Sequence, residues 1–257
     1  MPNQKILYVT TEMFPYQEEN NMAMMVNKMA LKMHQEGNDV RVFMPRFGLI
    51  SERKFQLHEV IRLSGMNIII NDMDQPLIIK VASLPGERLQ VYFIDNEEYF
   101  KRKQYYVDEE GNPFEDNDER AIFFARGVIE TIKKLNWVPD VIHFNGWMSS
   151  FIPIYLKNYY KTDSYFNDTK LVLSAYNETD LPLTNNIQQK LEFDDIKDLK
   201  ALKKPSFQSF VIESMDLVDV IIKGDEFLEG DLGKSYDKAK ADKKEYMNAD
   251  SIAEVYN

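Results

Sequence analysis

The sequence predicts an α/β fold: one doubly wound parallel sheet with a small β-hairpin insertion. Short, nearly continuous apolar runs of strand length alternate along the chain with segments whose apolar residues recur at helical spacing. Strands that are apolar on both faces are typical of a parallel sheet covered by helices on each side. A hydrophobic content of 44% agrees with a substantial core.

The first half of the chain supplies strands, one long helix and the hairpin. A helix is predicted over residues 20–35, because Met22, Val26 and Met29 fall on one face, and Gly37 ends it. Strands are predicted at residues 5–10, 39–45, 66–70, 77–83 and 89–94. The two runs at 66–70 and 77–83 form the hairpin insertion, and 89–94 returns to the parallel sheet.

The second half continues the alternation after a long polar excursion. Residues 97–118 are rich in turn and aromatic residues, and long excursions of this kind are often functional. Helices are predicted at 117–135, 147–160 and 206–215, and strands at 138–144, 170–174 and 218–222. We therefore expect a domain of residues 1–224 followed by a mixed-charge tail, 225–257. The sequence does not decide whether that tail docks as a helix or stays mobile.

Composition excludes several classes of function. With 31 basic and 42 acidic residues, the net charge of −11 disfavours binding to nucleic acid and to anionic membrane surfaces. The chain has no cysteine, and His34, His58 and His143 make no zinc-ligand spacing, so we expect no metal and no cofactor. No signal-peptide pattern and no apolar run of membrane length occur, which predicts a cytoplasmic protein.

The turn between the first strand and the first helix has the position of an anion site but not its residues. A helix N-terminus presents unpaired N–H groups that attract phosphate, and glycines normally precede it. Here Glu18 and Glu19 would repel a diphosphate, whereas Asn20 and Asn21 can cap the helix. Two interpretations stay open: a capped surface helix, or a site that some other ligand uses.

Three turns are expected to meet at the carboxyl edge of the sheet, where the ligand crevice of such folds lies. They follow Thr10, Phe144 and Ser174. With these turns, four segments resemble bacterial glycogen and starch synthases in order and spacing. They are Thr-Glu-Met-Phe-Pro at 11–15, Tyr-Phe-Ile-Asp-Asn-Glu-Glu-Tyr-Phe at 92–100, Asp-Asn-Asp-Glu-Arg at 116–120 and Pro-Asp-Val-Ile-His at 139–143.

The resemblance extends from the first residue to about Gly224 and covers the N-terminal starch-synthase catalytic domain. It implies a Rossmann-like fold, the N-terminal half of a two-domain (GT-B) glycosyltransferase. Such enzymes transfer glucose from ADP-glucose, or UDP-glucose in some relatives, to an α-1,4-glucan without a metal. The N-terminal domain mainly faces the glucan acceptor, and the C-terminal domain holds most of the nucleotide sugar.

The chain departs from the family pattern in three turns. The family's Lys-Thr-Gly-Gly-Leu falls on residues 18–22, so the lysine expected at the nucleotide sugar is Glu18. The family's His-x-His-Asp-Trp falls on 143–147, where Asn145 replaces the histidine expected to contact the transferring glucose, and Gly146 replaces the aspartate. In the third turn, Tyr176 replaces the histidine of the family's His-Asn pair.

The resemblance implies five substrate-binding positions but identifies no catalytic residue. They are Tyr106, His143, Asn145, Trp147 and Asn177. Structural alternatives stand beside them: His143 as a core histidine bonded to backbone, Asn145 as a turn residue, and Trp147 as a packing residue. Tyr105, next to Tyr106, is a further candidate for stacking on sugar.

The sequence ends where the family's C-terminal domain, which binds the sugar donor, would begin, so we expect this donor domain to be absent. That expectation leads to two hypotheses about function. In the first, the chain completes a glucosyltransferase by pairing with a donor-domain polypeptide or with itself, and meets ADP-glucose only with that partner. In the second, it is a non-catalytic module that binds α-1,4-glucan or regulates its synthesis. A relic domain with an unrelated partner is a third option.

Overall fold

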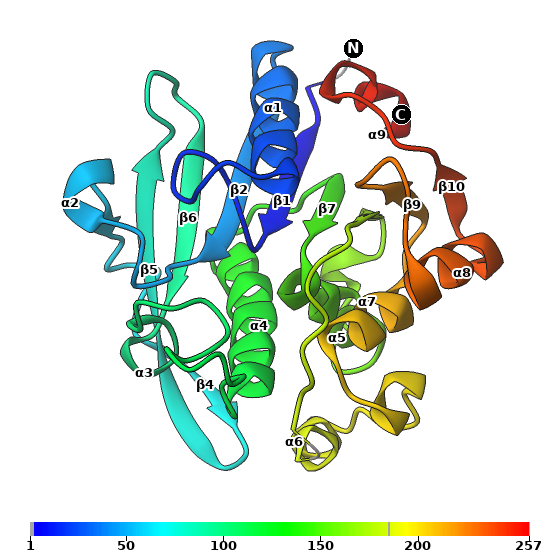
Figure 1. Cartoon of the computed structure of the whole chain (residues 1–257). Coiled ribbons are helices and arrows are strands. Elements are labelled where there is room, and N and C mark those ends of the chain that lie inside the picture. Colours follow the sequence, from blue (N-terminus) through cyan, green and yellow to red (C-terminus); the bar gives the residue numbers. More distant parts are fainter. Residues whose placement is uncertain (1–2, 185, 257) are drawn as a thin grey trace.

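A computed structural model describes residues 3–184 and 186–256, which build an α/β fold around one large sheet (Figure 1). The strand order is β10-β9-β8-β7-β1-β2-β6-β5-β3, with β4 paired to β5 beside it. The strands are β1 (Lys5–Thr10), β2 (Asp39–Pro45), β3 (His58–Glu59), β4 (Met66–Ile70), β5 (Met73–Ser83), β6 (Gln90–Asp95), β7 (Val141–Asn145), β8 (Lys170–Ala175), β9 (Val220–Lys223) and β10 (Asp242–Lys244).

The part of the sheet in the spatial order β6-β2-β1-β7-β8-β9 is parallel, as the sequence predicted, and β10, which the sequence did not predict, adds parallel to β9. β5 pairs antiparallel with β6, β4 and β3, which makes the hairpin insertion. The longer helices connect the parallel strands. They are α1 (Asn21–Gln35), α4 (Asn117–Leu135), α5 (Phe151–Lys157), α6 (Ile187–Phe193), α7 (Phe207–Met215) and α8 (Gly230–Lys238), and the short ones are α2 (Glu52–Phe55), α3 (Glu97–Phe100) and α9 (Ala253–Tyr256).

Local sequence explains where most of these elements begin. Asn20 caps α1, because its Oδ1 accepts the backbone N–H of Ala23 at 2.8 Å, and the methionine stripe predicted for this helix is buried. Several boundaries differ from the prediction. β7 begins at Val141, after Pro139 and Asp140, and the predicted helix 147–160 is a 3₁₀ turn, η1 (Trp147–Ser150), followed by α5. β5 begins four residues before the predicted 77–83, and β9 begins two residues after the predicted start at 218.

The segment beyond Gly224 docks on the body of the protein. β10 adds to the edge of the sheet parallel to β9, and α9 returns to the N-terminal strand, as the red segment beside β1 in Figure 1 shows. The hydroxyl of Tyr256 lies 2.7 Å from His143 Nδ1 and donates to the Tyr8 hydroxyl at 2.8 Å. All three side chains are buried. A buried polar chain therefore ties the end of the described chain to its first strand.

Among the described residues, no helix has both the length and the apolar character needed to cross a membrane.

We predict that Tyr256→Phe destabilises the protein by about 1–3 kcal/mol, because His143 and Tyr8 lose a shared buried hydrogen-bond partner. Urea unfolding followed by circular dichroism measures the change in the free energy of unfolding. Tyr246→Phe is the matched control, since the Tyr246 side chain is 42% exposed. Equal stability of the two variants would contradict the role given to the Tyr256 hydroxyl.

Candidate functional site

The three turns that the sequence brings to the carboxyl edge of the sheet meet there. The backbone N–H of Thr11 donates to the Asn145 carbonyl at 3.1 Å, and the Tyr176 hydroxyl donates to Asn145 Oδ1 at 3.2 Å. Gly146 has a φ of +83°, and a Cβ there would lie 1.9 Å from Thr11 Oγ1. Only glycine fits this close approach without displacing its neighbour. The predicted convergence is confirmed.

His143 lies in the core below this junction. Its exposed fraction is 0%, and Nε2 lies 2.8 Å from Ser174 Oγ while Nδ1 faces Tyr256. Burial lowers the pKa of His143 to about 3, so the ring is neutral at pH 7. Both ring nitrogens are engaged by side-chain hydroxyls rather than by backbone. A role in substrate binding stays a prediction that this buried position does not favour.

Asn145 and Trp147 are equally enclosed, with exposed fractions of 0% and 1%. Asn145 Nδ2 donates to the His143 carbonyl at 3.2 Å, which completes the amide's contacts together with Tyr176. The Trp147 ring stacks on Phe207, with ring centres 3.6 Å apart and an 8° angle between the planes. Its Nε1 has no hydrogen-bond partner in the part of the chain that the structure describes.

Tyr106 stands beside this aromatic stack and is half-buried. Its ring meets those of Trp147 and Phe207 edge-on, at centre distances of 5.5 and 5.4 Å. The Tyr106 hydroxyl is buried and makes no hydrogen bond of ordinary geometry with the described residues, although the Thr11 side chain lies close enough to lower its pKa against the rise caused by burial. This hydroxyl and the indole N–H of Trp147 therefore lie on neighbouring rings with little or no hydrogen bonding.

A fully buried arginine positions the excursion that carries Tyr106. One guanidinium nitrogen of Arg120 donates to the Tyr105 carbonyl and to Asn117 Oδ1, both at 2.7 Å, and Asn117 Nδ2 donates to the Tyr106 carbonyl at 2.8 Å. Burial lowers the pKa of Arg120 to about 10, which still leaves it charged at neutral pH. The excursion is thus an ordered loop.

Asn177 is exposed, but its hydrogen bonds hold residues 224–229, here called the rim segment. Its backbone N–H donates to Asp225 Oδ2 at 2.7 Å and its Nδ2 donates to the Phe227 carbonyl at 2.6 Å, while its Oδ1 accepts the N–H of Glu229 at 2.9 Å. Asn21 Nδ2 binds the same segment, because it donates to the Gly224 carbonyl at 2.9 Å and to the Asp225 carboxylate.

The turn ahead of α1 is acidic, and one asparagine caps the N-terminus of the helix. Asn20 caps the helix as predicted and donates to the Glu12 carboxylate. Asn21 does not cap, because it is the first helical residue and its amide reaches the rim segment instead. Burial raises the pKa of Glu12, whereas Glu18 and Glu19 are exposed. Glu18 stands at the position of the lysine that the family resemblance implies.

The sequence reasoning missed Glu178, a half-buried carboxyl at this edge. Burial, together with the negative charges of Glu12 and Asp225, raises the pKa of Glu178 to about 8. A hydrogen bond from the backbone N–H of Trp147 lowers this pKa but does not cancel the rise. The carboxyl is therefore mostly protonated at pH 7. A signal was present in the sequence: the loops 11–20, 176–180 and 224–231 together contain nine Asp or Glu residues and no Lys, Arg or His.

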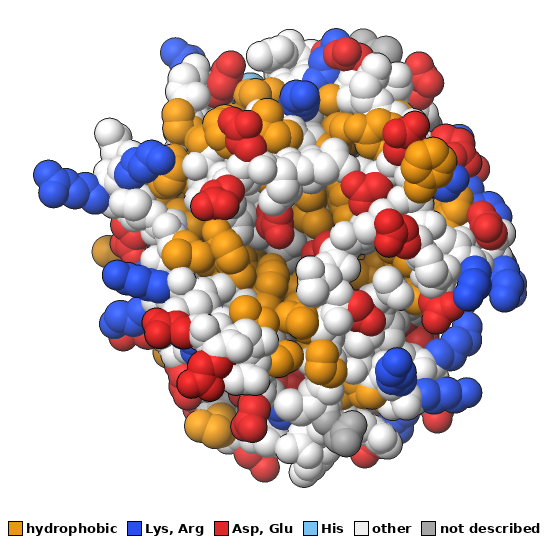
Figure 2. Space-filling model, in the orientation of Figure 1, with side chains coloured by type: hydrophobic (Ala, Val, Ile, Leu, Met, Phe, Trp, Pro, Cys, Tyr) orange, Lys and Arg blue, Asp and Glu red, His pale blue; other side chains and the backbone are white. Residues whose placement is uncertain are grey.

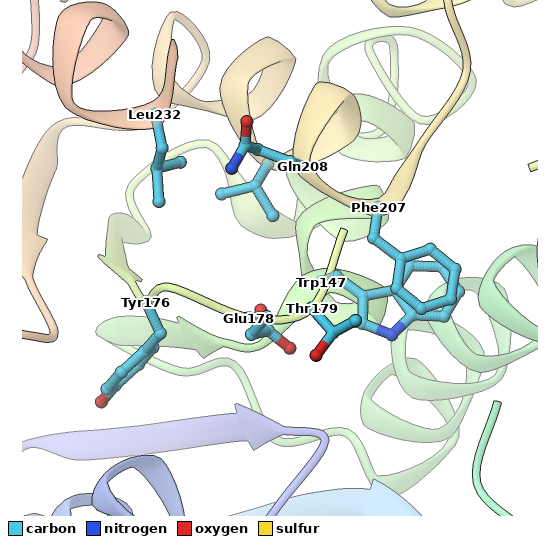
Figure 3. A pocket seen from close by; sticks show the side chains of 8 residues that line it. Trp147, Tyr176, Glu178, Thr179, Phe207, Gln208 and Leu232 are labelled. Carbon is cyan, nitrogen blue, oxygen red and sulfur yellow. The ribbon is translucent and has the colours of Figure 1, made fainter. Parts of the chain in front are cut away.

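A small hollow opens beside Glu178, between the loop after β8 and helices α7 and α8 (Figure 3). It is lined by Trp147, Tyr176, Glu178, Thr179, Phe207, Gln208, Val211 and Leu232. Its volume, including the open mouth, is about 210 Å³. Ordinary ligand pockets have roughly 300–1,000 Å³. The hollow therefore suits a single small group rather than a whole sugar chain.

The surface around the crevice is acidic with an apolar floor. Figure 2 shows hydrophobic side chains at the centre of this face, Asp and Glu around them, and Lys and Arg toward the periphery. Within the described ranges, no group of three or more His, Asp or Glu side chains is arranged to hold a metal ion. The described residues of this site offer hydrogen-bond donors, aromatic rings and negative charge, and the loops 11–20, 176–180 and 224–231 contain no basic side chain for a phosphate.

Comparison with known proteins decides the family. The family described as the starch synthase catalytic domain matches residues 5–222. The chain belongs to this family. The glycogen synthase of Chlorobium limicola is 39% identical over 176 residues, which cover 68% of this chain and 36% of the relative. The glycogen synthase of Chlorobium chlorochromatii is 37% identical over 185 residues, covering 70% and 38%.

A solved structure agrees with the fold. The catalytic domain of Starch Synthase IV from Arabidopsis thaliana, bound to ADP and acarbose, superposes with a TM-score of 0.76 at 14% identity. The match covers 98% of this chain and 53% of that one. This starch synthase-family chain thus has the fold of part of a GT-B glycosyltransferase, and it spans about a third of the length of the curated relatives it matches.

We predict that Gly146→Ala is more destabilising than Gly86→Ala. Both glycines have a φ near +83°, so both variants carry strain of about 1–2 kcal/mol. A Cβ at Gly86 meets nothing within 4 Å, whereas one at Gly146 meets Thr11 and adds about 1–3 kcal/mol of overpacking. Urea unfolding of the two variants measures the difference, and equal losses would contradict the tight junction.

We also predict a pH dependence of stability from His143. The unfolded chain takes up a proton at this residue below about pH 6.5, but the folded chain does so only near pH 3. His143 therefore removes roughly 1.4 kcal/mol of stability per pH unit as the pH falls through this window. Urea titrations at pH 7.5, 5.5 and 4.5 should give a flatter profile for His143→Gln than for the wild type. Parallel profiles would contradict the prediction.

Proposed function

We propose that the chain is the acceptor-side half of a glucosyltransferase that extends α-1,4-glucan from ADP-glucose, with a partner polypeptide holding the nucleotide sugar. Membership of the starch synthase family and the likeness to glycogen synthases support the reaction class. The observation that carries the partner dependence is the absence of any Lys, Arg or His from three crevice loops that together hold nine carboxyl groups. The proposal places the chain in the cytoplasm.

The physical argument concerns the leaving diphosphate. Its developing charge needs preorganised donors or cations, and loss of one such group typically costs about 3–4 kcal/mol of transition-state stabilisation. Glu18 stands where the family resemblance implies a lysine, and Glu18 and Glu19 repel the diphosphate instead. The nucleotide sugar must therefore be held by another surface, either a donor-domain polypeptide or a second copy of this chain.

The acceptor side is supported by the aromatic wall of the crevice. Tyr106 packs edge-on against Trp147 and Phe207, and its buried hydroxyl makes no hydrogen bond of ordinary geometry with the described residues. Sugar hydroxyls accept hydrogen bonds from such a group, and flat sugar faces pack on aromatic rings. These features suit an α-glucan acceptor better than they suit an anion.

A second candidate is a non-catalytic module that binds or regulates α-glucan. The observation in its favour is that the polar side chains that the family resemblance implies for binding substrate already form hydrogen bonds within the protein. His143 and Asn145 are buried with their hydrogen bonds made, and Asn177 holds the rim segment. A protein of this kind would bind maltooligosaccharides without binding ADP-glucose.

Incorporation of radiolabelled ADP-glucose into glycogen tests the proposal. The chain alone should incorporate no label, and the chain with an extract of its host, deleted for this gene, should incorporate more than either component. Incorporation by the chain alone would overturn the partner dependence, and no gain over the extract would defeat the enzyme. Calorimetry with maltoheptaose and ADP-glucose then identifies the module, which binds only the first.

A further inference from the structure

The negative charge at the crevice is uncompensated. Glu178 reaches the hollow, and Glu12 and Asp225 lie close enough to raise its pKa. In the part of the chain that the structure describes, no basic side chain forms a hydrogen bond or ion pair with these three carboxyl groups. Their partners are the neutral amides of Asn20 and Asn21 and backbone N–H groups. A cation brought to this place would therefore gain attraction from all three.

The walls of the hollow suit a compact cation. Tyr176, Trp147 and Phe207 contribute aromatic surface on two sides, and Glu178 and Thr179 contribute oxygen atoms, as Figure 3 shows. Aromatic rings attract ammonium groups through their negative faces, most strongly where water is excluded. The small volume of the hollow suits one ammonium group better than a sugar chain.

A second, independent observation indicates a ligand at the same place. The Trp147 side chain is 1% exposed and forms part of the wall of the hollow, yet its indole N–H has no acceptor among the described residues. An unpartnered buried donor costs free energy unless a ligand supplies an acceptor. A metal ion offers none. A polypeptide offers both complements, a backbone carbonyl for the N–H and a lysine ammonium for the carboxyl.

The rim segment adds a feature typical of protein interfaces. Phe227 is 74% exposed, and its carbonyl is held by Asn177, so the ring stands on an ordered loop beside the acidic crevice. Aromatic anchors surrounded by polar residues dominate the energetics of protein–protein contacts. We propose that the hollow and the rim segment together form the docking site for a lysine-bearing segment of a protein partner. The inference rests on the proposed function, because the partner is the polypeptide that holds the nucleotide sugar.

Docking of an ammonium group ionises Glu178, so binding releases a proton at neutral pH. Affinity should therefore rise between pH 6 and pH 9 and fall with added salt. The other titratable groups that face Glu178 are Glu12, Asp225, Tyr106 and Tyr176. Burial raises the pKa values of both tyrosines, so neither contributes a charge in this window.

The two tryptophans of the chain make a direct test. In the full-length ¹⁵N-labelled protein, the Trp147 indole signal reports on the hollow, while Trp137 is the internal reference because its Nε1 donates to Asp39 at 2.7 Å. Titration with tetralysine should shift the Trp147 signal and leave that of Trp137 unchanged. If tetralysine does not shift the Trp147 signal, the hollow binds no lysine and the inference is overturned. If maltoheptaose shifts the signal and tetralysine does not, the hollow is a sugar subsite instead.

Matched variants separate the specific contact from net charge. Glu178→Gln should weaken tetralysine binding at least tenfold and abolish its rise with pH, whereas Glu110→Gln, on an exposed turn, should change neither. Equal affinities would mean that tetralysine reads only the overall charge of −11, and the docking site would be rejected. An unchanged Trp137 signal and melting temperature verify that each variant is folded.

The outcomes also separate this inference from the proposed function. If Glu178→Gln leaves extract-dependent glucosyl transfer intact and tetralysine does not shift Trp147, the docking site fails and the function stands. If tetralysine binds through Glu178 but extract never produces transfer, the docking site stands and the enzyme proposal fails.

Discussion

The contact between the turn after β1 and the turn after β7 organises the site. Thr11 donates its backbone N–H to Asn145, and Gly146 brings the two turns so close that no side chain fits between them. Because β1 and β7 are neighbours in a parallel sheet, their turns open on the same edge, and Tyr176 joins them from β8. The acidic turn ahead of α1 starts from this junction, whereas Arg120 holds the loop that carries Tyr106 and Asn177 holds the rim segment.

Electrostatics then determine what the crevice can hold. A helix N-terminus at a parallel sheet edge normally favours anions, through its dipole and its free N–H groups. Here Asn20 satisfies one of those groups itself, and carboxylates surround the turn. The fold shared with a starch synthase catalytic domain is thus combined with an acidic crevice. The proposed partner dependence and the proposed docking of a basic segment both rest on this reversal.

The buried polar chain from Tyr8 through Tyr256 and His143 to Ser174 explains a second feature of the molecule. It closes the fold across a sequence separation of 248 residues and makes the last described helix part of the core. A histidine that the family pattern marks as functional is thereby held neutral and enclosed. The match of His143 to the family's motif is compatible with a structural role, because packing in the core also limits which side chains fit at this position.

Periodicity and turn residues in the sequence alone were enough to predict the fold class and most element boundaries. The four motif segments indicated the family by resemblance, and the residues of the first turn showed that it is acidic. These are properties of neighbouring residues, so they can be read without a third dimension. Only the tertiary structure decided that Asn21 and Asn177 hold the rim segment, that residues beyond Gly224 dock, and that Glu178 titrates far from its usual range. Each depends on contacts between segments distant in sequence, because burial and field strength at a side chain are set by whatever folds against it.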